Sequence, residues 1–115
     1  MWPAKHFSRA EFACRCGCGA AVVDAELLAV LQQLRDHYQQ PITISSGHRC
    51  QAHNSTVGGS PASQHLTGQA ADFAVNGVSP RAVYVHLDRL YPRRYGLGLY
   101  PTWIHLDVRW VAARW

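Results

Sequence analysis

The sequence predicts an α+β fold in which helices cover one side of a small, mostly antiparallel sheet. One observation is a long amphipathic helical pattern at 24–38. Another is a set of short β runs at 42–45, 70–75 and 103–109, separated by turn residues. The third is size, since 115 residues with 48% hydrophobic composition fit one domain with a modest core. We therefore expect a single domain spanning 1–115.

The amino-terminal part begins with two predicted helical segments. Ser8 and Glu11 have the spacing of a capping box, which predicts one helical turn at 8–12. The second helix, 24–38, starts at Asp24, because an acidic residue favours the positive end of the helix dipole. Its leucines fall at helical spacing, and a following proline marks its end.

The middle of the chain is expected to alternate strands and loops. The β run at 42–45 ends at the loop residues Ser46-Gly47, and a short helix is expected at 51–57. A strand lined with small residues follows at 70–75 and ends at the turn Asn76-Gly77.

The carboxy-terminal part adds a helix and two strands. Ser79-Pro80 predicts a helix start, with serine as N-cap and proline at the first helical position, and the helix runs to about 90. Strands are expected at 96–100 and 103–109. Alternation along the last strand separates two sets of side chains: Ile104, Leu106 and Val108 on one face, and Trp103, His105, Asp107 and Arg109 on the other. We expect the first face to be core and the second to be functional.

Charge favours an anionic partner but not nucleic acid. The net charge is +4, yet the basic residues are scattered, with Arg93-Arg94 as the one adjacent pair, so no nucleic-acid stripe is present. The stretch 1–7 lacks the apolar core of a secretory signal, and no later run is long enough to cross a bilayer. We expect a chain made in the cytoplasm, monomeric and not inserted in a membrane.

Four cysteines fit three structural states. Three of them lie in a glycine-rich loop, and an even number without a signal peptide suits a metal knot as well as disulfides. The alternatives are a disulfide that ties the loop to Cys50, a structural zinc site, or free thiols. The residues concerned are Cys14, Cys16, Cys18 and Cys50.

Two histidines and one aspartate stand out as candidate metal ligands. His65 lies in a glycine-bearing loop, His105 on a strand face, and Asp72 on a third segment that can converge with them. Gly68 allows close backbone approach or a positive φ beside them. Two neutral imidazoles and one carboxylate form the ligand set of a catalytic Zn²⁺ with an open fourth position. The pattern therefore predicts a zinc site on His65, Asp72 and His105.

The motif Ser63-x-His65-x2-Gly68-x-Ala70-x-Asp72, with Ser46-Gly47-His48-Arg49 before it and His105 after it, resembles the D-alanyl-D-alanine metallopeptidase family. That family includes zinc D-Ala-D-Ala carboxypeptidases and dipeptidases and the L-alanyl-D-glutamate endopeptidases of phage endolysins. Its fold is shared with the amino-terminal domain of Hedgehog signalling proteins. The likeness extends over about 7–111.

The resemblance implies a role for each matching residue. It implies that His65, Asp72 and His105 hold the zinc. It also implies that Arg49 binds a substrate carboxylate or steadies the developing oxyanion, and that Ser63 hydrogen-bonds the peptide near the scissile bond.

The chain departs from the family pattern at Thr102. Family members with carboxypeptidase activity are similar in having an acidic residue three positions before the last histidine, and threonine cannot replace it as general base. Five of the seven acidic residues have ordinary helical explanations, and Asp72 is assigned to the metal, which leaves Asp107. Two residues beyond His105 on the same face, Asp107 lies roughly 7 Å further along the strand.

Two roles are open for Asp107. It is either the general base or a residue that orients His105 or pairs with Arg49 or Arg109. His48 and His53 are further candidates for proton transfer.

The sequence thus predicts a zinc peptidase that cleaves bacterial peptidoglycan stem peptides, of the endolysin or cell-wall endopeptidase type. Such an enzyme would accumulate in the cytoplasm and act on the wall after release. The alternatives are a D-Ala-D-Ala carboxypeptidase and a catalytically silent zinc-containing binding module. A nucleic-acid binder organised by a cysteine zinc knot is disfavoured by the scattered basic residues.

Overall fold

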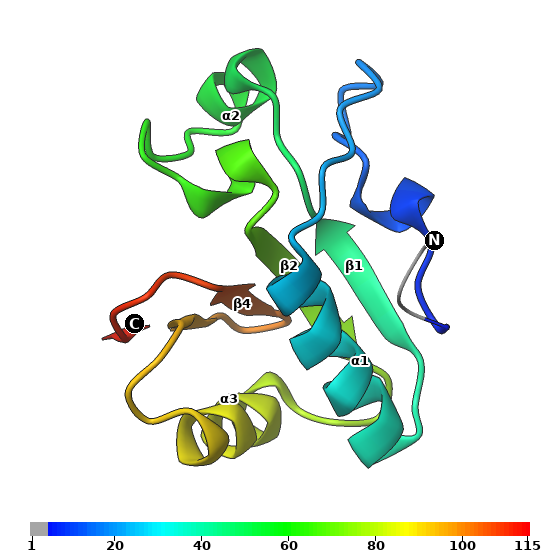
Figure 1. Cartoon of the computed structure of the whole chain (residues 1–115), viewed down its shortest axis with the longest axis vertical. Helices are drawn as coiled ribbons and strands as arrows, with labels where there is room; N and C mark the ends of the chain where they lie inside the picture. Colours follow the sequence, from blue (N-terminus) through cyan, green and yellow to red (C-terminus); the bar gives the residue numbers. More distant parts are fainter. Residues whose placement is uncertain (1–4) are drawn as a thin grey trace.

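A five-stranded sheet, described with the rest of residues 5–115 in a computed structural model, forms the centre of the molecule (Figure 1). The strand order is β1-β2-β4-β3-β5. The strands are β1 (Ile42–Ser46), β2 (Ala70–Val75), β3 (Gly96–Leu99), β4 (Ile104–Asp107) and β5 (Ala113–Arg114). All pairs are antiparallel except β3 with β5, which is parallel, so the predicted α+β fold with a mostly antiparallel sheet is confirmed. The first four residues, part of the stretch that lacks the features of a secretory signal, lie outside the described residues.

Helix ends lie close to where the sequence predicts them. The helical elements are η1 (Arg9–Phe12), α1 (Ala25–Tyr38), α2 (Gln51–Thr56), η2 (Gln64–Thr67) and α3 (Pro80–Leu90). The side chain of Asp24 caps α1 by accepting from the backbone N–H groups of Glu26 and Leu27, and Ser79 caps α3 in the same way from Ala82. Two elements were not predicted, the 3₁₀ helix η2 and the two-residue strand β5.

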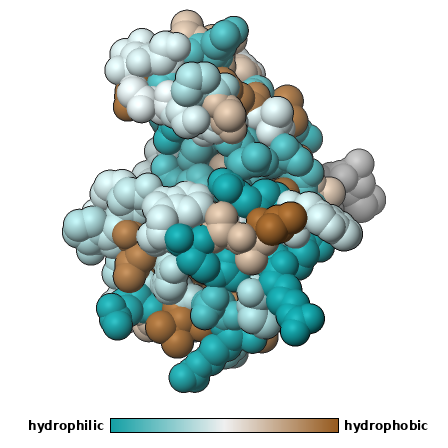
Figure 2. Space-filling view, turned by 90° about the vertical axis from the view of Figure 1, so that its left-hand side faces the viewer, coloured by the Kyte–Doolittle hydropathy of each residue, from teal (hydrophilic) through white to brown (hydrophobic). Residues whose placement is uncertain are grey.

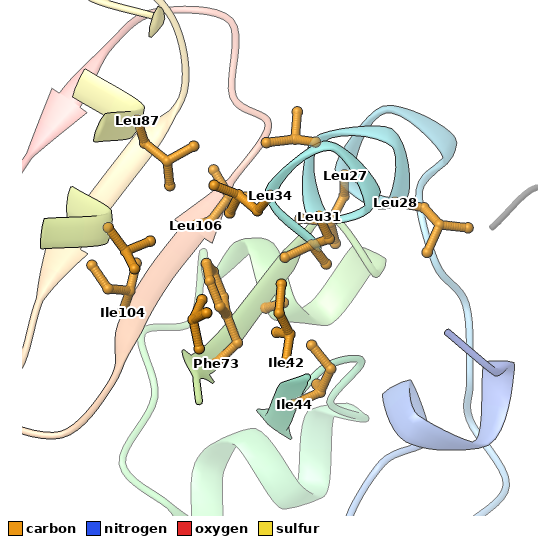
Figure 3. Packing of buried hydrophobic residues seen from close by; sticks show 14 of the residues in the cluster. Leu27, Leu28, Leu31, Leu34, Ile42, Ile44, Phe73, Leu87, Ile104 and Leu106 are labelled. Atoms are coloured by element: carbon orange, nitrogen blue, oxygen red, sulfur yellow. The ribbon is translucent and has the colours of Figure 1, made fainter. Parts of the chain in front are cut away.

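The core lies between one face of the sheet and the helices α1 and α3 (Figure 3). Its sheet side comes from alternate residues of β2 and β4, and its helix side from the leucine stripe of α1 together with Leu87 of α3. The contributors include Leu27, Leu31, Leu34, Phe73, Ile104 and Leu106. Each fully buried leucine side chain contributes roughly 1.5–3 kcal/mol. The predicted core face of the last strand is confirmed.

The opposite face of the sheet carries the polar residues. Because side chains alternate along a strand, burying Phe73 of β2 and Leu106 of β4 in the core directs Asp72, His105 and Asp107 to the other side. Helix α2 lies beyond the end of β1 and next to η2 (Figure 1). This second face is where the site forms.

Apolar surface is scattered. On the side shown in Figure 2, brown residues lie singly among hydrophilic ones, and the outline narrows between an upper part and a wider lower part. Trp110 and Val111 are among the large hydrophobic residues exposed near the carboxy terminus. Within residues 5–115, no helix has both the length and the apolar composition needed to span a bilayer.

Candidate metal centre

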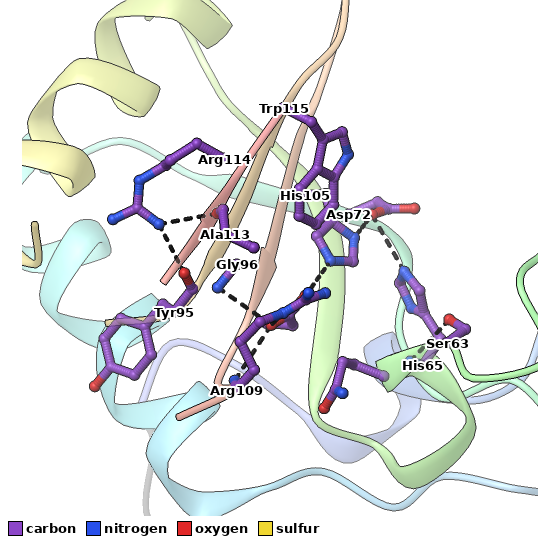
Figure 4. A network of polar contacts seen from close by, with 12 residues as sticks. Ser63, His65, Asp72, Tyr95, Gly96, His105, Arg109, Ala113, Arg114 and Trp115 are labelled. Carbon is purple, nitrogen blue, oxygen red and sulfur yellow. Dashed lines mark hydrogen bonds and ion pairs between the residues drawn. The ribbon is translucent and has the colours of Figure 1, made fainter. Parts of the chain in front are cut away.

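The sheet brings two of the predicted ligands face to face. β2 and β4 pair so that Asp72 lies directly opposite His105. The third predicted ligand, His65, reaches them from η2 (Figure 4). Residues from three separate segments therefore meet on the polar face of the sheet.

Local backbone geometry positions His65. The Ser63 hydroxyl caps η2 by accepting a hydrogen bond from the His65 backbone N–H at 3.2 Å. Gly68 ends η2 with φ +73°, and a Cβ there would lie 2.3 Å from the Val22 carbonyl oxygen. Both reasons for glycine given by the sequence, a positive φ and a close backbone approach, apply at this position.

The ligand atoms are close enough to share one ion. His65 Nε2 lies 3.3 Å from Asp72 Oδ1, and His105 Nδ1 lies 2.9 Å from the same oxygen. One ligand atom from each of the three residues lies within 4.8 Å of the others. Both imidazoles are almost fully buried, with His65 2% and His105 8% exposed. The structure thus brings together all three residues that the sequence selected.

The position of the proton on His65 leaves Nε2 free to bind a metal ion. Its Nδ1 lies 2.7 Å from the Gly47 carbonyl oxygen, which can only accept, so Nδ1 carries the proton and the neutral ring has its lone pair on Nε2. That buried Nε2 has no hydrogen-bond partner among the described residues, although it faces the Asp72 carboxylate. Two lone pairs that face each other are stabilised by a positive ion between them, and His₂Asp is a zinc donor set.

The Asp72 carboxylate is held in its ionised form. Burial alone would raise the pKa of Asp72, but the hydrogen bond with a protonated His105 and the positive charge of that ring outweigh burial and hold the pKa below its usual range. Metal ligation requires the ionised carboxylate.

A cleft of about 550 Å³ opens beside the three residues. Aromatic, small and basic residues line it together with the 57–60 loop. The side chains include Arg49, Ser63, Tyr100, Trp103, Arg109 and Trp115. The rings of Tyr100 and Trp103 stack at 4.6 Å between centroids and form a flat apolar wall.

A sequence model of the family described as peptidase M15 matches residues 5–107 of the chain. The chain belongs to the peptidase M15 family. No curated protein matched the chain. The M15 family is zinc-dependent. Membership therefore supports the identification of a zinc metallopeptidase, and His65, Asp72 and His105 are its candidate zinc ligands.

In this M15 peptidase, Asp107 lies beneath His105 and not in the cleft. Asp107 is fully buried, and its Oδ2 lies 2.8 Å from His105 Nε2. Arg109 donates two hydrogen bonds of 2.7 Å to the same carboxylate, and the backbone N–H groups of Arg109 and Gly96 donate two more (Figure 4).

These contacts favour one of the two roles that the sequence left open. When Asp107 accepts from Nε2–H, the neutral form of His105 has its lone pair on Nδ1, which faces Asp72 and the metal position. Both oxygens of Asp107 face donors from Gly96, His105 and Arg109, and Asp107 is not among the residues that line the cleft, so the geometry favours orientation of His105 over general base catalysis.

Arg49 is held in the cleft of the M15 peptidase by three contacts. Its Nε donates to the Ser46 hydroxyl, its Nη1 to the amide oxygen of buried Asn54, and its Nη2 lies 3.4 Å from Asp72 Oδ2. A guanidinium fixed at the edge of the site can meet an anionic group of a substrate without further ordering.

The two histidines considered for proton transfer lie elsewhere. His48 Nδ1 accepts from the Val22 backbone N–H, and its Nε2 faces the Leu66 carbonyl oxygen, so both ring nitrogens are engaged. Neither His48 nor His53 is among the residues that line the cleft. Thr102 is exposed in the turn before β4.

Sequence reasoning missed the residues that support the ligands. Gly47 orients His65 through a backbone carbonyl, and Asn54 fixes Arg49 from α2. Trp115 packs 5.1 Å from the His105 ring and covers one side of it. The sequence shows a Ser-Gly loop before Arg49. It does not show that a backbone carbonyl oxygen of this loop is the hydrogen-bond partner of His65.

Proposed function

We propose that this M15 peptidase hydrolyses peptide bonds in the stem peptides of bacterial peptidoglycan, as an endopeptidase of the endolysin or cell-wall type. The observation that carries the proposal is the His₂Asp donor set beside a cleft in which Arg49 is held in place. Stem peptides present free carboxylates near their scissile bonds, and a fixed guanidinium recognises a carboxylate.

Each residue at the site would have its own role in hydrolysis. Zinc, when bound by His65, Asp72 and His105, supplies the Lewis acidity that polarises a peptide carbonyl and activates water. Arg49 would bind a substrate carboxylate or stabilise negative charge that develops on the carbonyl oxygen. Ser63 accepts from a backbone N–H, so its hydroxyl proton remains available to a substrate peptide.

The positive charge of the chain supports a wall substrate. The net charge is +4, and the cell-wall polymers of bacteria are anionic, so the surface would itself supply affinity for the wall. Release of the protein from the cytoplasm when the membrane is breached, as for phage endolysins, is part of this proposal.

The decisive experiment is mass spectrometry of fragments released from purified peptidoglycan by zinc-loaded protein. We expect soluble stem-peptide fragments with new amino termini, lost with a chelator and restored by zinc. The Arg49→Lys variant keeps the charge but not the fork geometry, and it should release fragments more slowly. Intact peptidoglycan after incubation with folded, zinc-loaded protein would refute the hydrolase proposal.

A second candidate is a zinc-containing binding module without catalysis. The observation that favours it is that Asp72 is the one carboxylate among the described residues that line the cleft, so no acid there is free to serve as general base. Sedimentation with insoluble peptidoglycan without fragment release would support this module. Release of free D-alanine, with no larger fragment, would instead indicate a D-Ala-D-Ala carboxypeptidase.

A further inference from the structure

The four cysteines form a second cluster, separate from the His₂Asp centre. Their Sγ atoms all lie within 4.8 Å of one another, although Cys50 is distant in sequence from Cys14, Cys16 and Cys18. The Cys14–Cys16, Cys16–Cys50 and Cys14–Cys50 sulfur distances are 3.4, 3.6 and 3.8 Å. The four thiols are free.

These distances match a metal site better than a disulfide. A disulfide requires about 2.05 Å between two sulfurs and leaves the other two cysteines without a role. Four thiolates at about 2.3 Å from a tetrahedral Zn²⁺ lie roughly 3.8 Å apart. A single centre also explains why all four side chains converge, which a single pair does not.

The loop that carries three of the cysteines is shaped for this convergence. Gly17 and Gly19 adopt φ values of +83° and +89°, and no other atom lies near the position of their missing Cβ. The turn is closed by the Cys14 backbone N–H, which donates to the Ala20 carbonyl at 2.7 Å, and by the Gly17 N–H, which donates to the Cys14 carbonyl. The glycines therefore serve to fold the backbone around the sulfurs and not to avoid a clash.

Backbone donors already point at two of the sulfurs. The Cys50 N–H lies 3.4 Å from the Cys14 sulfur, and the His53 N–H lies 3.4 Å from the Cys50 sulfur, where Cys50 caps α2. N–H groups directed at sulfur stabilise the thiolate form, which is the form that binds metal.

We propose that Cys14, Cys16, Cys18 and Cys50 bind a structural Zn²⁺ ion. All four positions are filled by protein, which is the closed coordination of a structural zinc and excludes a catalytic role. The ion would join the loop that precedes α1 to the loop between β1 and α2. Cys50 directly follows Arg49, so the ion would anchor the segment that positions this cleft residue.

The test is metal content combined with thiol counting on protein purified under reducing, anaerobic conditions. We expect roughly two zinc ions per wild-type chain, one for each cluster. The Cys16→Ser/Cys18→Ser variant, which changes only exposed cysteines, should lose one equivalent, and His65→Ala should lose the other. Cobalt substitution of the wild type provides an independent reading, since thiolate ligands give intense charge-transfer bands that His and Asp ligands do not. The bands should persist in His65→Ala.

Three outcomes would overturn the proposal. One is a wild-type chain with a single zinc that the cysteine variant retains. Another is fewer than four reactive thiols after denaturation with a chelator and without reductant, which would indicate a disulfide. The third is absence of cobalt–thiolate bands in the wild type, a result that does not depend on whether any variant folds. None of these readings uses activity, so the proposal stands or falls separately from the peptidase function.

Discussion

Replacing Asp107 with asparagine is expected to weaken zinc binding because it reverses the tautomer of His105. Asp107 Oδ1 accepts from three donors, namely the N–H groups of Gly96 and Arg109 and the Nε of Arg109. Oδ2 faces Arg109 Nη2 and His105 Nε2. Three donors hold the single carbonyl oxygen of asparagine at the Oδ1 position, so its NH₂ group faces His105 Nε2. That nitrogen must then accept, and the proton moves to Nδ1, the atom directed at the metal position.

The magnitude follows from the class of interaction. Loss of a partner that orients a metal-bound histidine typically costs 10–100-fold in metal affinity or activity. We expect the zinc Kd to rise by this factor, which corresponds to about 1.4–2.7 kcal/mol. The new amide would also oppose a donor of Arg109, because an NH₂ group cannot accept.

The assay is a competition titration with a chromophoric chelator, in the Cys16→Ser/Cys18→Ser background so that one site is titrated. Asp36→Asn is the matched control, because it makes the same chemical change on a carboxylate whose side chain is 62% exposed. Thermal unfolding of the apo protein checks that the fold persists. An unchanged zinc Kd together with lost turnover would refute the orienting role and indicate a general base.

Three further predictions test the site and its frame. Gly68→Ala should lower the free energy of unfolding by about 1–3 kcal/mol in urea titration, and by more than Gly58→Ala, which shares the positive φ but meets no atom within 4 Å. Equal losses in the two variants would show that the contact with Val22 is unimportant.

Arg49→Lys should lower kcat/KM for stem peptides by about 10–100-fold, because the bidentate guanidinium is lost. It should leave the zinc content unchanged, because the positive charge is kept. Zinc loss would place Arg49 in metal binding.

The third of these concerns pH. Burial opposes ionisation, but hydrogen bonds from His105 and Arg109 hold the pKa of Asp107 below its usual value. Because the folded pKa is below the unfolded one, this contribution to apo-protein stability is full above about pH 4 and is lost as pH falls further. The free energy of unfolding of Asp107→Asn should therefore fall less steeply below about pH 4 than that of the wild type. Equal slopes of the two curves in acid would contradict the lowered pKa of Asp107.

The sequence was most informative where side-chain type and backbone geometry act together. The helix starts at Asp24 and Ser79 and the core face of β4 follow from local rules, and the structure has them. The candidate ligand set could be selected because a histidine–carboxylate combination beside Gly68 is unusual in a core. The structure brings Asp72 and His105 together by pairing β2 with β4, a pairing that periodicity alone does not specify.

The features that could not be predicted from the sequence depend on backbone atoms and on packing between distant segments. β5 is two residues long and pairs in parallel with β3 through backbone hydrogen bonds, so it has no hydrophobic pattern. The role of Asp107 depends on the hydrogen-bond donors around its carboxylate. These include groups of Gly96 and Arg109. Strand alternation placed Asp107 on the functional face but did not show that Arg109 and His105 enclose it.

The site has a sheet half and a loop half, and they should respond differently to loss of the cysteine cluster. Asp72 and His105 are fixed by strand pairing, whereas His65 is oriented by the Gly47 carbonyl. A Cβ on Gly47 would lie 2.7 Å from the Phe12 backbone, so this loop is packed against the chain that leads into the cysteine loop.

Hydrogen exchange can separate the two halves. In Cys16→Ser/Cys18→Ser, the amides of His48, which donates to Phe12, and Arg49, which donates to His65, should exchange faster. The amide of Phe73 in β2 should be unaffected, because its strand is held by β1 and β4 on both sides. Ser55→Ala, an exposed position of α2, would serve as the control for an unrelated change near the loop. Uniform acceleration across the sheet would show that the cysteines stabilise the whole fold, and no acceleration at His48 and Arg49 would show that they do not anchor the loop.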